Sequence, residues 1–254
     1  MISKNTIKLI NSLAYKKYRN KEGLFLVEAD KSVTEILQSD NEIYMLAATA
    51  EFINSRKHLI STPEVITEVS HTEIKKLSHL KNPQNSIAIC RIPNPGQLPA
   101  KLGNNLSVYL DDIQDPGNLG TIIRVCDWFG IEYLFCSPDT VDIYSSKVIQ
   151  ASMGSFNRIK TFKADFEVVQ SIAKNSGVII YGTFMSGTNV YNENLPTKAL
   201  LVMGNEGNGI KAEIESKIEK KISIPNFSKS NNKAESLNVA MATAIICSEF
   251  KRKG

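Results

Sequence analysis

The chain has 254 residues, of which 42% are hydrophobic and 22% charged, and its formal net charge is +4. This composition is typical of a globular protein, and the length suits two ordinary domains. No apolar run approaches the ~18–20 residues that a membrane helix needs. The basic start lacks the apolar core of a signal peptide. We therefore expect a cytoplasmic protein without membrane attachment.

The four cysteines and three histidines do not form a recognisable metal or disulfide pattern. No Cys-x-x-Cys pair is present, and His58, His71 and His79 lie far along the chain from Cys126 and Cys136. Zinc sites and disulfide frameworks use closely spaced ligands or paired cysteines. The sequence predicts no metal site, and reduced, mostly buried thiols are the expected state.

Positive charge is concentrated at the N-terminus. Residues 1–31 carry seven Lys or Arg and three Asp or Glu, and the difference of four equals the net charge of the whole chain. A basic patch of this kind suits a phosphate backbone. The alternative is an amphipathic helix whose lysines face water, and charge alone favours it.

Hydrophobic periodicity in the first ninety residues predicts a small α/β unit. The expected helices cover 6–19, 31–38 and 74–80, and the expected strands cover 24–29, 43–48, 65–69 and 87–92. Residues 92–105 then bring three prolines and two glycines with little apolar content, which indicates a linker. We place the domains at 1–92 and 106–254, joined by the linker 93–105.

The second half predicts a parallel sheet covered by helices on both faces, because strand and helix patterns alternate. Expected strands cover 106–110, 133–136, 178–181, 199–203 and 222–224. Expected helices cover 119–129, 145–151, 166–174, 210–218 and about 235–251.

Polar clusters follow several of these strands, where an open parallel sheet binds its ligands. In the first cluster, an Asp-Pro-Gly turn precedes Asn118, which we expect to cap the following helix. Arg124 points away from the buried face of that helix, toward the crevice above the strand. A surface arginine paired with Asp127 explains it equally well.

Two further clusters are rich in glycine. Gly182-Thr183 follows the third strand of this half, and Gly204, Gly207 and Gly209 follow the fourth with Glu206 among them. The spacing G-x-x-G-x-G matches neither the dinucleotide-binding nor the P-loop pattern. It suits a ligand approached by backbone amides, whereas a tight turn explains only one of the three glycines.

The last cluster precedes the final helix. Ser236 or Glu235 could cap this helix. Asn238 is expected just inside it, where asparagine has poor helix propensity, and this suggests a hydrogen-bonding role.

Taken in order, the segments DPGNLGTIIRVCDWFG, LVMGNEGNGI and IPNFSKSNNKAESLNVAMATAI resemble the SpoU/TrmH family of RNA 2′-O-ribose methyltransferases in the SPOUT superfamily. The segment KKYRNKEGLFLVEADKSVTEIL resembles the family's L30e-like substrate-binding domain, with Ala29 where the family usually has glycine. The resemblance implies a C-terminal trefoil knot and a homodimer with its active site near the subunit interface. It also implies S-adenosylmethionine as methyl donor without a metal, and structured RNA as substrate, with ribosomal RNA favoured over transfer RNA.

The resemblance also implies roles for individual residues. Arg124 would orient or activate the ribose hydroxyl. The catalytic set would be Arg124, Asn118, Glu206, Ser236 and Asn238, and the cofactor-binding set Gly182, Thr183, Gly204, Ile224 and Leu237.

This chain departs from the family pattern after Ile-Pro. Asn226 stands where the family usually has methionine, and the loop 226–235 is longer and carries Lys229 and Lys233. Two alternatives stay open on the residues alone. One is a non-catalytic RNA-binding relative; the other is a nucleotide-dependent enzyme such as a dehydrogenase, which the absence of G-x-G-x-x-G disfavours.

Overall fold

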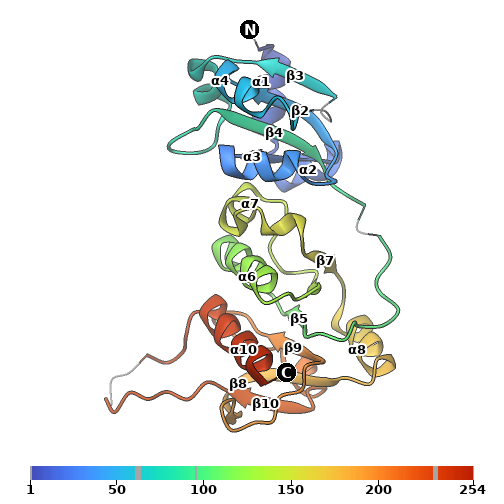
Figure 1. The fold of residues 1–254 in the computed structure, drawn as a ribbon. Coiled ribbons are helices and arrows are strands. Elements are labelled where there is room, and N and C mark those ends of the chain that lie inside the picture. The colour runs from blue at the N-terminus through green and yellow to red at the C-terminus, as the bar shows by residue number, and fades with distance from the viewer. Residues whose placement is uncertain (1, 61–63, 95, 231–233, 254) are drawn as a thin grey trace. The chain divides into compact units, whose positions relative to one another are not determined.

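The computed structural model describes residues 2–60, 64–94, 96–230 and 234–253. The chain forms two compact units, each with its own sheet. The first unit comprises residues 1–94 and 142–157, and the second comprises 95–141 and 158–254. Figure 1 labels the helices and strands of both units.

The first unit is built on a four-stranded sheet in the order β1-β4-β2-β3. β4 runs antiparallel to β1 and β2, and β3 runs parallel to β2. The strands are β1 (Leu24–Glu28), β2 (Ile43–Ala48), β3 (Val65–Glu68) and β4 (Ser86–Arg91). The helices are α1 (Lys4–Ser12), α2 (Lys16–Glu22), α3 (Asp30–Leu37), α4 (Ala50–Arg56), α5 (His71–Leu77) and α7 (Ser146–Ser152), followed by the 3-10 turn η1 (Ser155–Asn157).

The segment 142–157 lies in the first unit, although the sequence analysis assigned it to the second domain. Its apolar side chains complete the first unit's core. Ile149 is buried there, and the rings of Tyr144 and Phe156 lie 4.9 and 5.9 Å from the ring of Phe25. This segment packs in the first unit because its apolar side chains are buried there. Its position in the sequence, between strands of the second unit, does not reveal this packing.

The single helix predicted for 6–19 is two helices, α1 and α2, and Arg19 explains the break. Its Nη1 donates to the backbone carbonyls of Leu13 and Ala14 at 2.7 and 2.9 Å, and its Nε and Nη2 donate to Asp142 Oδ2 at 2.9 and 2.5 Å. The guanidinium is buried and satisfies carbonyls that a continuous helix would have used.

Two local features in this unit have clear physical causes. Ala29, directly before α3, has φ +78°, a region where a Cβ is strained, so the family's usual glycine suits this backbone better. α5 begins with a capping box, in which Ser70 accepts from the Glu73 amide and the Glu73 carboxylate accepts from the Ser70 amide.

The second unit contains a six-stranded, all-parallel sheet in the order β10-β8-β9-β5-β6-β7. This confirms the α/β parallel sheet predicted for the second half. The strands are β5 (Ser107–Leu110), β6 (Tyr133–Cys136), β7 (Lys160–Lys163), β8 (Ile179–Asn189), β9 (Ala199–Met203) and β10 (Lys220–Ser223). β7 was not predicted, because its burial pattern is mostly exposed.

The helices of this unit are α6 (Pro116–Trp128), α8 (Phe166–Asn175), α9 (Ala212–Glu215) and α10 (Val239–Lys253). α6 packs against α10 (Figure 1). α8 and α9 contribute to an apolar cluster with the sheet that includes Phe166, Val169 and Ile214. Within the described ranges, no helix is long and apolar enough to cross a membrane.

Candidate active site

Strand order reverses between β5 and β9. From β5 the chain adds β6 and β7 on one side, then crosses to build β8, β9 and β10 on the other. Parallel α/β sheets bind ligands beyond the carboxyl ends of strands at such a switch point. The Asp111–Asn118 segment follows β5 and the Gly204–Gly209 segment follows β9, so both predicted clusters leave from neighbouring strands.

Asp115, not Asn118, caps α6. The Asp115 carboxylate accepts from the Asn118 amide at 2.8 Å, and Pro116 occupies the first helical position. The prediction that Asn118 caps the helix is therefore wrong. Proline fits the first helical turn because no amide is needed there, which shifts the helix start by three residues. Asn118 is left in the first turn with its side chain turned outward.

The Asn118 side chain joins three distant segments. Its Nδ2 donates to Glu206 Oε1 at 2.9 Å, and its Oδ1 accepts from Asn238 Nδ2 at 2.9 Å. Asn118 comes from α6, Glu206 from the loop after β9, and Asn238 from the start of α10. We call this chain of hydrogen bonds the amide bridge. It connects one residue from each of the three matched motifs.

The direction of the amide bridge is fixed by α10. Asn238 Oδ1 accepts from the backbone amides of Ala240 and Met241 at 2.9 and 3.3 Å. Because backbone amides only donate, Asn238 must present its NH2 group to Asn118, which then presents its own NH2 group to the Glu206 carboxylate. Asn238 therefore occupies the N-cap position, so the predictions that it lies inside the helix and that residue 235 or 236 caps it are wrong.

The glycine-rich loop after β9 is held by close backbone packing. A Cβ on Gly204 would overlap the backbone of Gly209 and Ile210, so this position has no room for a side chain. Asn205 pairs with Gly209 in an isolated bridge, and its Nδ2 donates to the Asp112 carbonyl at 2.7 Å. These contacts fix the backbone that carries Glu206.

Asp111 is a structural residue for which the sequence analysis assigned no role. Its side chain is fully buried, and its Oδ2 accepts from the Lys211 amide at 2.8 Å. Burial raises the pKa of this carboxyl group, although the nearby Lys211 opposes the shift. The contact ties the end of β5 to the start of α9, which covers only Ala212–Glu215 of the helix predicted for 210–218. An acid directly after a buried strand was the available signal.

The residues expected to bind the cofactor lie on adjacent strands or directly after them. Gly182 and Thr183 lie within β8, which runs to Asn189, so the prediction that they follow the end of a strand is wrong. Gly182 pairs with Val202 of β9 and Lys221 of β10. The register of β8 against β10 then shifts, and the next paired residues are Thr188 and Ile222. A Cβ on Gly182 would press on the side chains of Phe184 and Ile218. Gly204 follows β9 in the same part of the sheet.

Ile224 and Leu237 are the apolar members of the cofactor set. Ile224 directly follows β10 and is half-buried, whereas Leu237 directly precedes Asn238 and is 51% exposed. Glycines on and after these strands, together with an exposed leucine, fit a ligand that combines an apolar ring with polar edges met by backbone groups.

Arg124 and Ser236 lie on the chain segments that carry Asn118 and Asn238. Arg124 is exposed on α6, six residues beyond Asn118 and so about 9 Å further along the helix axis. Asp127, the alternative partner considered for it, forms an ion pair with Arg158 at 2.8 Å. Ser236 is exposed and two residues before Asn238. Among the described residues, no group of three or more His, Cys, Asp or Glu side chains could hold a metal.

The model of the SpoU rRNA Methylase family matches residues 105–248, more than half of the chain. The chain belongs to this family. Residues 4–88 match the MRM3-like substrate binding domain. Membership makes the protein an RNA methyltransferase that depends on S-adenosylmethionine, consistent with the relatives and structures below.

The chain is 29% identical over 236 residues to the 23S rRNA (guanosine(2553)-2′-O)-methyltransferase RlmP of Bacillus subtilis, covering 91% of this chain and 90% of that one. A TrmH-family structure from Porphyromonas gingivalis is 37% identical with a TM-score of 0.87, and each chain is covered completely. The AdoMet-bound rRNA methyltransferase from Sinorhizobium meliloti is 28% identical with a TM-score of 0.85, covering 99% and 96%. A tRNA (guanosine(18)-2′-O)-methyltransferase from Aquifex aeolicus also matches, at 33% identity over 157 residues, 60% of this chain and 72% of that one.

Proposed function

We propose that this enzyme transfers the methyl group of S-adenosylmethionine to a ribose 2′-hydroxyl of structured RNA, with ribosomal RNA favoured over transfer RNA. The observation that carries the proposal is the amide bridge, because it joins the three matched motifs at the switch point of the sheet. The relative that matches nearly the full chain acts, by its name, on 23S rRNA. Transfer RNA is the alternative substrate, since a shorter match acts on tRNA.

The five residues expected to bind the cofactor have the chemistry that S-adenosylmethionine requires. Gly182, Thr183 and Gly204 offer backbone groups where side chains are absent or small, and Ile224 and Leu237 offer apolar contacts. When bound, S-adenosylmethionine supplies a methyl group on a positively charged sulfonium. In this proposal the protein fixes the position of the donor through these five residues.

The remaining task is to orient the ribose hydroxyl, which is a weak nucleophile and loses its proton as it reacts. Holding two reactants in line supplies several kcal/mol of the barrier. Arg124 orients the hydroxyl or the neighbouring phosphate through its guanidinium, whose N–H groups donate hydrogen bonds and which has no acceptor. Ser236 and the amide bridge of Asn118, Glu206 and Asn238 hold the ribose and the motif loops in place.

We also propose the larger organisation that the family resemblance implies. The protein is a cytoplasmic homodimer with its active site near the subunit interface. The C-terminal segment forms a trefoil knot. Residues 1–92, completed by the segment 142–157, form an L30e-like RNA-binding domain, and the linker 93–105 joins it to the methyltransferase domain that the rest of 106–254 forms. The fit of the N-terminal substrate-binding model supports the domain assignment.

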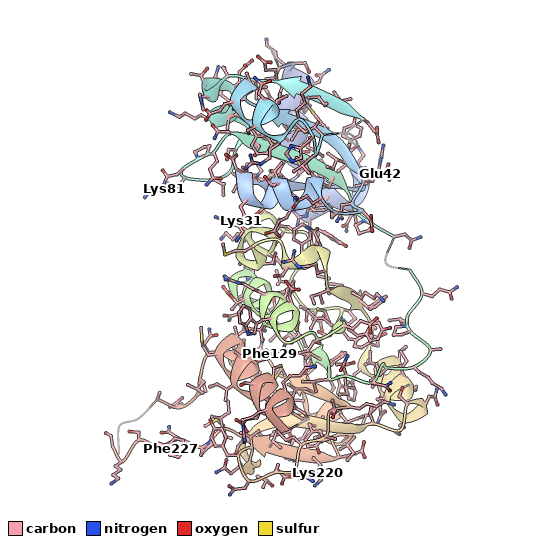
Figure 2. The ribbon with its side chains drawn as sticks, viewed as in Figure 1. Lys31, Glu42, Lys81, Phe129, Lys220 and Phe227 are labelled. Carbon is pink, nitrogen blue, oxygen red and sulfur yellow. The ribbon has the colours of Figure 1, made fainter. Side chains whose placement is uncertain are left out.

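The long loop after β10 is a proposed RNA contact. Asn226 donates from Nδ2 to the Ala234 carbonyl at 3.1 Å and so closes the base of the loop. Phe227 is 78% exposed there, on the arm that extends from the sheet of this unit (Figure 2). Lys229 is exposed beside it, whereas Lys233 lies outside the described residues.

Two experiments test this function. Labelled methyl transfer from S-adenosylmethionine to total RNA, with mapping of the modified ribose, identifies the substrate; the absence of any transfer would contradict the proposal. Calorimetry of cofactor binding separates an enzyme from a non-catalytic relative. Arg124→Ala should abolish transfer and leave cofactor affinity nearly unchanged, and an active Arg124→Ala enzyme would remove the role assigned to this residue.

A further inference from the structure

The surface of α2 in the first unit carries two exposed tyrosines. Tyr15 is 66% exposed and Tyr18 is 40% exposed, and their rings meet edge to face with centroids 6.4 Å apart. Large apolar side chains on a protein surface usually lie singly, so an adjacent pair calls for an explanation. Neither residue contributes to the core of this unit.

The backbone of the helix that carries the tyrosine pair is fixed by a buried arginine and by a glycine at its C-terminal end. Arg19, one residue after Tyr18, is 3% exposed and donates to two carbonyls of the turn before α2 and to Asp142. Gly23 ends the helix with φ +64°. The two aromatic rings therefore project from a backbone fixed at both ends, and little conformational entropy is lost when they bind a partner.

The charge around the pair favours a polyanion. Lys16, Lys17 and Lys21 are exposed on the same short helix, whereas Glu22 is its one acidic residue and lies 3.6 Å from the Lys21 ammonium. Arg19, counted earlier among the basic residues of the N-terminus, does not belong to this surface because it is buried in an ion pair.

We propose that Tyr15 and Tyr18, with Lys16, Lys17 and Lys21, form a stacking platform for an unpaired nucleotide of the RNA substrate. Proteins read single-stranded RNA by stacking its bases on aromatic rings while lysines neutralise the adjacent phosphates. In a duplex the bases are already stacked on one another, so the platform selects loops, bulges or ends. The proposal rests on RNA being the substrate, and it assigns to α2 a contact far along the chain from the methyl-transfer motifs.

The test uses a fluorescein-labelled, mixed-sequence 12-nucleotide RNA, single-stranded or annealed to its complement, with the full-length protein. Loss of stacking on one base corresponds to roughly a tenfold weaker Kd. Tyr15→Ala/Tyr18→Ala should weaken single-strand binding by at least this factor and duplex binding much less. Tyr15→Phe/Tyr18→Phe keeps both rings and should bind within about twofold of wild type. Unchanged thermal unfolding of the alanine variant excludes misfolding as the cause.

The lysines are tested by salt dependence, with a matched control. In a plot of the logarithm of the binding constant against the logarithm of the salt concentration, Lys16→Gln/Lys17→Gln should reduce the slope. The reduction should be about 0.7 for each phosphate of a single strand that is no longer neutralised. Lys75→Gln/Lys76→Gln removes the same charge from exposed positions on α5 and should leave the slope close to wild type. Equal slopes for the two pairs would show a general charge effect and overturn the platform.

Two other outcomes would also overturn it. Wild-type affinity of the double alanine variant shows that the tyrosines do not stack on RNA. A change in sedimentation with unchanged RNA affinity shows instead that the pair is a protein contact. Methyl transfer to total RNA by the wild-type enzyme is measured in parallel, so that failure of the enzymatic function is distinguished from failure of the platform.

Discussion

Asn238 performs two tasks that a pair of substitutions can separate. Its Oδ1 caps α10 by accepting from two backbone amides, and its Nδ2 donates to Asn118 in the amide bridge. Asn238→Ala removes both contacts. Asn238→Asp keeps the cap, because a carboxylate accepts from backbone amides and is favoured at a helix N-terminus. It cannot donate to Asn118.

The structure sets the expected magnitudes. Loss of an N-cap costs about 1 kcal/mol, and an exposed amide–amide hydrogen bond contributes about 0.5 kcal/mol or more. Asn238→Ala should therefore lower the free energy of unfolding by about 1–2 kcal/mol. Asn238→Asp should stay within about 1 kcal/mol of wild type, since it keeps the cap and loses only the exposed hydrogen bond.

The rate of methyl transfer should depend on the amide bridge and not on the helix cap. In Asn238→Asp the Asn118 side chain faces a carboxylate on each side. Its NH2 group donates to Glu206 or, after an amide flip, to the new aspartate, so its carbonyl oxygen always meets one of the two carboxylates. We expect kcat for methyl transfer to fall at least tenfold, about 1.4 kcal/mol in the barrier, with a nearly unchanged cofactor Kd. Urea unfolding and single-turnover methylation measure the two effects. A fully active Asn238→Asp enzyme, or one as unstable as Asn238→Ala, would refute the reasoning.

Three further predictions concern stability. Hydrogen bonding, first of all from the Ser70 amide, lowers the pKa of Glu73 from 4.5 to about 2. The ionised Glu73 carboxylate therefore stabilises the folded state fully above the unfolded pKa of 4.5, and this stabilisation is lost as pH falls toward 2. Thermal unfolding should show Glu73→Gln less stable than wild type at pH 7 and equally stable near pH 2. A stability difference that does not change with pH would contradict this prediction. Gly204→Ala should lower the free energy of unfolding by about 1–3 kcal/mol through overpacking, and it should weaken cofactor affinity measured by calorimetry. Gly207→Ala should change neither quantity much, because its Cβ would have its nearest neighbour at 3.6 Å. Ala29→Gly should stabilise the protein by about 1 kcal/mol by relieving a positive φ, and a lower urea midpoint would rule that out.

Sequence patterns located the strands of the second half except β7, and the three polar motifs, because buried parallel strands and glycine-rich turns leave strong local signals. They could not show how the motif side chains pair. Asn118 was expected to be a cap because it precedes an apolar helical run, but Pro116 moved the helix start forward and left Asp115 as the cap. The hydrogen bonds of Asn118 to Glu206 and Asn238 span 88 and 120 residues, and such separations leave no trace in local periodicity.

The same limit applies to the first unit. The helix break near Leu13 depends on Arg19, whose guanidinium is held by Asp142 more than a hundred residues later. Ala29 gave a usable signal, since a family glycine indicates a backbone that favours positive φ, and the structure has that conformation.

The inclusion of segment 142–157 in the first unit makes the chain cross between the two units three times. A fragment ending at residue 94 would lack Ile149 and Tyr144 and leave the ring of Phe25 uncovered. A fragment starting at residue 95 would carry those apolar side chains without their packing partners. The first unit therefore cannot be exchanged among relatives as one contiguous segment, because recombination that alters its core must replace two separate stretches of the gene together.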